Sequence, residues 1–202
     1  MPNKNKNRGK TGERYFADIL SNISGLHFHR TFTSGAFVGS SNRERIKQIT
    51  MGQTINNLGD ISAPEMLKYL LIFESKNYTE VFIHQLLNGE CKQIFGWLKE
   101  MMFDVNSALL SIKKQALGFL CIKYTSKGNF VVVNKGMMKK YKLRLIDSYI
   151  KFNHPEIPED LIKDGWDNCF YMMDFAPFFE LNKEFLFQKM SDEEILQLIK
   201  NQ

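Results

Sequence analysis

Apolar residues recur at helical spacing in several stretches of the chain. Residues 12–24 place their apolar side chains on one face, and Thr11 stands where a helix N-cap is expected. Residues 81–104 repeat this spacing, and the basic segment 135–150 is compatible with a further helix. Residues 191–194 have the sequence of a capping box, which predicts a short final helix.

Short apolar runs bounded by turn residues predict strands between these helices. The runs lie at residues 26–32, from 59 onward, 68–76, 116–124, 130–133 and 169–175. A turn near Pro64 would join the second and third strands as a hairpin, and Gly128-Asn129 would turn between the next two strands. Residues 154–166 contain two prolines and are typical of a loop.

This order of elements predicts an α/β fold with a mixed central sheet flanked by helices. At 202 residues, the chain is long enough for one core domain, which we place at residues 11–150. Residues 1–10 are polar and basic, as in a flexible arm, and residues 151–202 are expected to form a C-terminal extension packed on the core. The long polar segment 33–58 is typical of a functional connection.

The net charge of +5 at pH 7 conceals an uneven distribution. Residues 1–60 carry nine Lys and Arg against four Asp and Glu, and residues 61–154 carry fourteen against seven. Residues 155–202 carry four against eleven. A basic body with an acidic tail favours a polyanion as partner, although the same pattern can serve solubility alone.

Cysteine usage and hydropathy indicate the cellular compartment of the protein. Cys91, Cys121 and Cys169 match neither a zinc spacing nor a disulfide framework, which predicts reduced and mostly buried thiols. No apolar stretch reaches the ~18 residues of a membrane span. The polar N-terminus lacks the apolar segment of a secretory signal, so we expect a cytoplasmic protein without membrane contact.

The strand predicted at 68–76 ends in a charged pair. Because side chains alternate along a strand, Glu74 and Lys76 share one face, roughly 6.5 Å apart. Buried charges are costly unless they are paired or bound to a metal. A carboxylate and an ammonium at the end of a core strand therefore suggest a metal-assisted active site, whereas Glu74-Ser75-Lys76 alone could also be an exposed, salt-bridged strand end.

Two further acids precede this strand. Glu13 falls on the apolar face of the first helix, where an acid costs stability unless a positive charge meets it. In the first turn it could instead satisfy the helix dipole. Asp60 follows a glycine at the start of the second strand.

The order of these four residues resembles the PD-(D/E)xK nuclease superfamily, in which Glu on the first helix is followed by Asp on the second strand and (D/E)-x-K on the third. More closely, the segments 9–13, 30–35, 59–61 and 73–76 resemble the Holliday junction resolvases of archaea and phages. The resemblance covers about residues 8–90 and implies a restriction-endonuclease-like fold. The connection before Gly59 is longer than in the compact archaeal enzymes, and the chain beyond Asp104 lies outside the motifs.

The resemblance also implies a catalytic set of Glu13, Asp60, Glu74 and Lys76. Asp60 and Glu74 would hold Mg²⁺, for which Mn²⁺ is expected to substitute, and Glu13 would complete the metal shell directly or through water. Lys76 would orient the attacking water or stabilise the developing negative charge.

DNA contacts are expected from side chains near this catalytic set. Gln85 would hold water or phosphate, although a solvated helix residue is an equal interpretation. The expected contacts are Lys10, Arg30, Ser34, Arg43, Arg45 and Gln85.

These observations favour a magnesium-dependent endonuclease that hydrolyses branched DNA, in particular Holliday junctions, during DNA recombination and repair in a bacterium or a phage-infected cell. A junction offers two symmetric cuts, so we expect a homodimer. One alternative is a restriction- or homing-type endonuclease of the same superfamily, which would read duplex sequence through residues 36–58 and the C-terminal extension. Others are a non-catalytic DNA-binding module and a protein-interaction domain.

Overall fold

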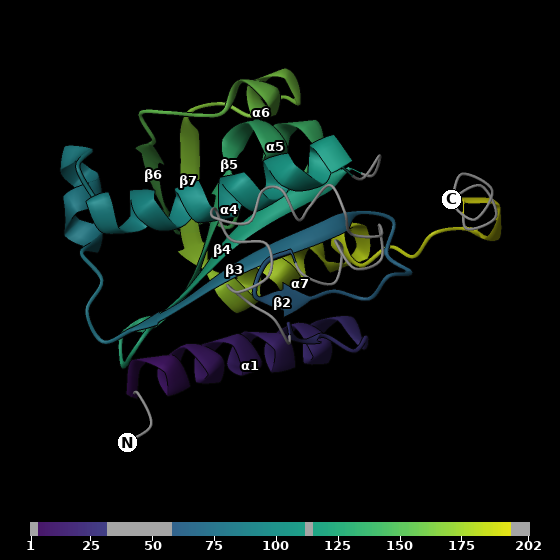
Figure 1. Cartoon of the computed structure of the whole chain (residues 1–202), viewed down its shortest axis with the longest axis horizontal. Helices are drawn as coiled ribbons and strands as arrows, with labels where there is room; N and C mark the ends of the chain where they lie inside the picture. Colours follow the sequence, from purple (N-terminus) through teal and green to yellow (C-terminus); the bar gives the residue numbers. More distant parts are fainter. Residues whose placement is uncertain (1–3, 32–57, 112–114, 195–202) are drawn as a thin grey trace.

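The computed structural model describes residues 4–31, 58–111 and 115–194 (Figure 1). The helices are α1 (Lys4–Ser24), the 3₁₀ helix η1 (Ile83–Asn88), α4 (Lys92–Ser111), α5 (Lys135–Lys140), α6 (Glu159–Lys163) and α7 (Phe175–Leu186). The strands are β1 (His29–Arg30), β2 (Ile61–Ser62), β3 (Leu70–Tyr78), β4 (Ala116–Tyr124), β5 (Gly128–Asn134), β6 (Tyr149–Asn153) and β7 (Cys169–Asp174).

The strands form one seven-stranded sheet in the order β1-β2-β3-β4-β5-β7-β6. β3 and β4 pair in parallel over their whole length, and the other described pairs are antiparallel. The parallel pair requires a crossover, which contains η1 and α4. The sheet confirms the predicted α/β fold with a mixed central sheet and agrees with a restriction-endonuclease-like architecture.

Helices cover both faces of the sheet (Figure 1). On one face, the ring of Phe73 in β3 lies 6.0 Å from that of Phe179 in α7, and α1 contacts both β3 and α7. On the other face, Lys76 contacts Glu100 of α4. Because side chains alternate along β3, Glu74 lies on the α4 face with Lys76.

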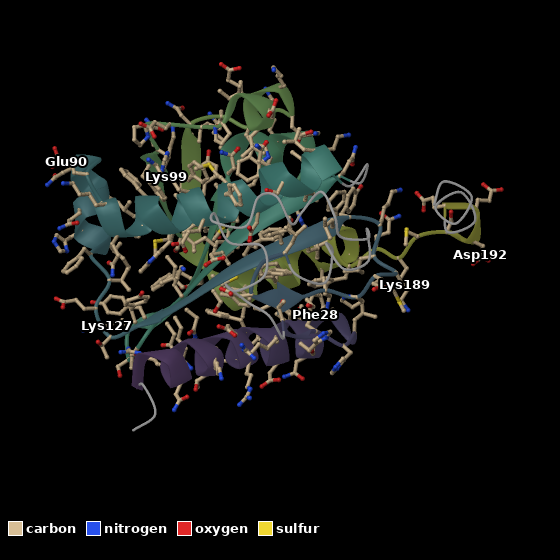
Figure 2. All side chains as sticks on the ribbon, viewed as in Figure 1. Phe28, Glu90, Lys99, Lys127, Lys189 and Asp192 are labelled. Carbon is tan, nitrogen blue, oxygen red and sulfur yellow. The ribbon has the colours of Figure 1, made fainter. Side chains whose placement is uncertain are left out.

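Aromatic side chains fill the core between the sheet, α1 and α7. Phe28, labelled in Figure 2, is buried and makes edge contacts with Phe73 and Phe187. Phe178 and Phe179 are fully buried. The three cysteines are free and buried, which confirms the expected reduced thiols.

The first helix is longer than its sequence suggests. We expected it at about residues 12–24, but α1 begins at Lys4, so residues 4–10 of the predicted arm are helical. Thr11 is not an N-cap, because its hydroxyl donates to the Asn7 carbonyl one turn earlier. Within the described residues 26–31, the strand predicted at 26–32 is also shorter, because β1 covers His29–Arg30.

The continuous helix predicted at 81–104 was wrong. The segment contains two helices, because η1 ends at Gly89, whose φ of +71° turns the chain before α4 begins. The apolar spacing persists across this break, which is why periodicity alone misses it.

Several other boundaries differ from prediction. The β4–β5 turn occupies residues 125–127, and Gly128 already belongs to β5. The helix predicted over 135–150 ends at Lys140, and the predicted loop 154–166 contains α6. Helix α7 was not predicted.

The final capping box is confirmed by reciprocal hydrogen bonds. The Ser191 N–H donates to the Glu194 carboxylate, and the Glu194 N–H donates to the Ser191 hydroxyl.

The C-terminal part of the chain contributes to the central sheet, because β7 lies between β5 and β6. The division into an arm, a core and an extension stays a prediction. Most of the predicted connection 33–58 lies outside the described residues. Within the described ranges, no helix has the length and apolar character needed to cross a membrane.

Candidate active site

Asp60 lies where β2 separates from β3. Its N–H donates to the Phe73 carbonyl over 2.7 Å, and Ile61 pairs with Phe73 in the ladder. Two residues further along β3, the Ser75 N–H donates a 2.9 Å hydrogen bond to the Asp60 carboxylate. A side chain therefore replaces the backbone partner of β3, and this bond fixes the Asp60 carboxylate beside Glu74-Ser75-Lys76.

Gly59 permits this arrangement. Its φ is +70°, a conformation that residues with a Cβ rarely adopt. A Cβ at this position would lie 2.7 Å from the Phe73 carbonyl oxygen and 3.0 Å from its nitrogen. The glycine before Asp60 is therefore required by the close approach of the chain to β3.

Glu74 and Lys76 lie together on the α4 face of β3, as their spacing predicts. The Glu74 carboxylate is 2.7 Å from Lys76 Nζ, and their side chains are only 11% and 17% exposed. The alternative of an exposed, salt-bridged strand end is wrong, because Glu74 and Ser75 are buried. The structure thus brings Asp60, Glu74 and Lys76 to one end of the β2–β3 pairing.

Helix α4 adds two carboxylates that sequence reasoning missed. The Glu100 carboxylate lies 2.5 Å from Lys76 Nζ, so Lys76 contacts both Glu74 and Glu100. One turn later, the Asp104 carboxylate accepts a 3.1 Å hydrogen bond from the Gly59 N–H. The sequence does contain one sign of Asp104's role, because an aspartate stands between the apolar residues Phe103 and Val105. This sign points to the site only when α4 is known to face β3.

Burial and mutual repulsion perturb these acids. Burial and the charge of Glu13 raise the pKa of Asp60 to about 6, against the opposing effect of the Ser75 N–H bond. Burial and then Asp60 raise the pKa of Glu74 well above its usual value. Burial likewise raises the pKa of Asp104 to about 6, with Asp60 adding to the shift. Among the described residues, the carboxylates of the site therefore outnumber the positive charges near them.

Neighbouring carboxylates stabilise the charged form of Lys76. Burial alone would lower the pKa of its ammonium, but Glu74 and Glu100 outweigh burial and leave the pKa above its usual range. Lys76 is accordingly a cation at neutral pH and acts through its charge and N–H donors.

Glu13 reaches the site region from α1. Gly12 allows α1 to approach β3, because a Cβ there would lie 2.7 Å from the Asn77 Cβ. The Glu13 carboxylate accepts a hydrogen bond from Nε of Arg30 in β1. The buried acid thus meets a positive charge, as its position on the apolar face requires, and its helix is too long for the first-turn interpretation.

The predicted DNA contacts are only partly described. Arg30 lies next to Glu13, Lys10 is half-buried in α1, and Gln85 is half-buried in η1 rather than at the start of a long helix. Ser34, Arg43 and Arg45 lie outside the described residues. Their roles stay predictions.

The acids fit a hard divalent cation, although they do not form a closed cage. In the part of the chain that the structure describes, no three His, Cys, Asp or Glu side chains are grouped closely enough to hold a metal ion. Asp60 and Glu74 supply one half-buried and one buried carboxylate, both with raised pKa values, and such an excess of negative charge is what a cation would relieve. Mg²⁺ is commonly bound by one or two carboxylates and several waters.

Comparison with known proteins agrees with this geometry. Neither a curated protein nor a solved structure matches the chain significantly. A family model described as phage putative PDDEXK endonuclease matches residues 4–185, a range that contains α1, the whole sheet and all the acids described above. The chain therefore belongs to this phage PDDEXK endonuclease family, within the PD-(D/E)xK nuclease superfamily.

Proposed function

We propose that this nuclease is a magnesium-dependent DNA endonuclease that hydrolyses phosphodiester bonds in branched DNA, with Holliday junctions as its substrate. The observation that carries the metal-dependent chemistry is the convergence of Asp60, Glu74 and Lys76 where β2 leaves β3. Membership of the endonuclease family supports the hydrolytic reaction.

In this reaction a water oxygen bonds to phosphorus while the bond from phosphorus to the leaving sugar oxygen breaks. Bound Mg²⁺ would supply a nucleophilic hydroxide near neutral pH and offset negative charge on the phosphate. Asp60 and Glu74 are the residues that would hold it. Lys76, a protonated amine, would orient the attacking water and stabilise charge developing on the phosphate.

Glu13 and Arg30 act beside this centre in the proposal. Glu13 would contribute to the metal shell through water, because its carboxylate is already bound by Arg30. Arg30 would in turn face the DNA backbone, where guanidinium groups bind phosphate well. Lys10, Ser34, Arg43, Arg45 and Gln85 remain candidate DNA contacts.

The branched substrate rests on the resemblance of segments 9–13 and 30–35 to Holliday junction resolvases, and on the basic charge of residues 1–154. We propose a homodimer, because a junction offers two equivalent strands to cut. Recognition of shape through phosphates predicts affinity that falls steeply with salt. A role in recombination or repair in the cytoplasm of the host cell belongs to the same proposal.

The test compares equal concentrations of four-way junction, flap, duplex and single-stranded DNA with Mg²⁺, Mn²⁺ or EDTA. We expect symmetric nicks in the junction with either metal and none with EDTA. Equal cutting of duplex and junction would reject the resolvase assignment and keep the endonuclease. Discrete cuts in an unbranched plasmid would favour the restriction- or homing-type alternative. DNA binding without cleavage under any condition would leave a non-catalytic module.

A further inference from the structure

Two carboxylates of α4 contact the residues that flank the proposed metal site. Glu100 binds Lys76 Nζ, and Asp104 binds the N–H of Gly59, the residue before Asp60. They are four residues apart and therefore lie on one side of the helix. Neither belongs to the Glu, Asp, Glu-x-Lys pattern of the sequence. We propose that Glu100 and Asp104 are positioning residues of the nuclease, Glu100 acting through Lys76 and Asp104 through Asp60.

Glu100 is the second carboxylate that contacts Lys76, beside Glu74. Lys76 has two partners, Glu74 at 2.7 Å and Glu100 at 2.5 Å. A divalent cation held by Glu74 would compete with the ammonium for the same carboxylate and repel it. Glu100 is then the counter-charge that retains Lys76 beside the reacting phosphate. Its side chain is 58% exposed, so its removal leaves no buried group without a partner.

Asp104 binds the backbone of Gly59. Gly59 passes so close to Phe73 that there is no room for a Cβ on Gly59, and the φ of Gly59 is positive. The Asp104 carboxylate accepts the Gly59 N–H and ties the turn to α4. The next residue, Asp60, is tied to β3 through the Phe73 carbonyl and the Ser75 N–H. Asp104 therefore fixes the direction from which Asp60 enters the site.

A nearby ion pair provides a matched control. Lys99, labelled in Figure 2, precedes Glu100 on α4 and pairs with Glu156 over 2.9 Å. Both side chains of this control pair are more than half exposed. Glu156→Gln removes the same chemical group as Glu100→Gln from a lysine that does not contact Glu74. A general effect of lost surface charge would appear in both variants.

The Glu100 experiment has one readout that needs no cleavage. Acylation of Lys76 by an amine-reactive ester, followed by mass spectrometry, should become several-fold faster in Glu100→Gln and stay unchanged in Glu156→Gln, because the amine loses one of two carboxylate partners. With junction DNA and Mg²⁺, kcat should fall about tenfold in Glu100→Gln. KM and the affinity for Mn²⁺ by calorimetry should remain within about twofold of the parent, because Glu100 is not a ligand.

The Asp104 experiment uses a conservative pair. Asp104→Asn keeps an oxygen that can accept the Gly59 N–H, whereas Asp104→Ala does not. We expect faster hydrogen exchange at the Gly59 amide and about tenfold weaker Mn²⁺ binding in Asp104→Ala. Asp104→Asn should keep amide protection and most of the affinity for Mn²⁺. An equal loss in both variants would show that the charge matters rather than the hydrogen bond, which overturns this role.

The inference rests on the proposed function, but the two fail differently. Unchanged Lys76 acylation together with an unchanged kcat in Glu100→Gln would overturn the Glu100 role while the nuclease stands. A parent protein that cuts no DNA with any metal would reject the proposed function, and the acylation and exchange measurements would still decide the two contacts.

Discussion

Two groups of charged residues lie near the end of the β2–β3 pairing, and they differ in their balance of acids and bases. On the α1 side, Glu13 meets Arg30, one acid with one base. On the α4 side, the described residues include four carboxylates, those of Asp60, Glu74, Glu100 and Asp104, and one ammonium, that of Lys76, which contacts Glu74 and Glu100. The first group is neutralised within the chain, whereas the second has an excess of negative charge. The sequence motif unites Glu13 with Asp60 and Glu74, but the structure assigns them to environments suited to different tasks.

The largest expected difference between the two groups is in catalysis. Asp60→Asn and Glu74→Gln should each lower the rate of DNA cleavage roughly 10³-fold, because both remove a proposed metal ligand. Junction affinity in a gel-shift assay should stay within about threefold, since basic residues dominate binding. Cleavage that persists in both variants would show that the chemistry lies elsewhere.

Metal binding should stabilise the folded protein only when the proposed metal ligands are intact. At a Mg²⁺ concentration about 100 times the dissociation constant, the free energy of unfolding should rise by about 2.7 kcal/mol. The rise should be absent in Asp60→Asn and present in Glu156→Gln. Differential scanning calorimetry with and without EDTA measures it, and an equal rise in Asp60→Asn would mean that the ion binds at another place.

The α1 pair should behave as a local ion pair. Glu13→Gln or Arg30→Met should each lower the free energy of unfolding by about 1–3 kcal/mol, because each removes the opposite charge that contacts a largely buried ionic side chain. The double variant should lose less than the sum of the single losses. Urea denaturation of the four proteins gives the coupling energy, and strict additivity would contradict a direct interaction.

The excess of acids on the α4 side predicts an unusual response to pH. The folded-state pKa values of Asp60 and Asp104 are raised from 3.8 to about 6, so the folded protein binds more protons than the unfolded chain between these values. The stability of the metal-free protein should therefore fall as pH rises from about 4 to about 6 and stay lower above that range. For Asp60 this loss is about 1–3 kcal/mol.

Asp60→Asn isolates that contribution. The variant should be more stable than the parent near pH 7 and should flatten the pH dependence, measured by urea denaturation in EDTA. A parent stability that rises with pH over this window would contradict the raised pKa values.

Local pattern was sufficient to predict β3 and its charged end. The run 69–73 before Glu74 is apolar, and strand alternation correctly placed Glu74 and Lys76 on one face of β3. The glycine before Asp60 and the hairpin to β3 could also be read from adjacent residues. These features depend on neighbours in the chain or on one strand pairing, which sequence patterns record.

The contributions of α1 and α4 could not be read in the same way. Arg30 reaches Glu13 only because β1 is added to the sheet edge beside α1, and Glu100 and Asp104 reach the site only because the β3–β4 crossover lays α4 over β3. The break at Gly89 also sets where α4 begins and which of its side chains face the sheet. Such long-range contacts depend on the completed fold rather than on local spacing.

The most direct test of the account is a crystal structure grown with Mn²⁺, with anomalous scattering used to locate the ion. The account predicts an anomalous peak bound by the carboxylates of Asp60 and Glu74, with Lys76 still in contact with Glu100. A structure without a peak at these two carboxylates, at a Mn²⁺ concentration that supports full DNA cleavage in solution, would contradict it.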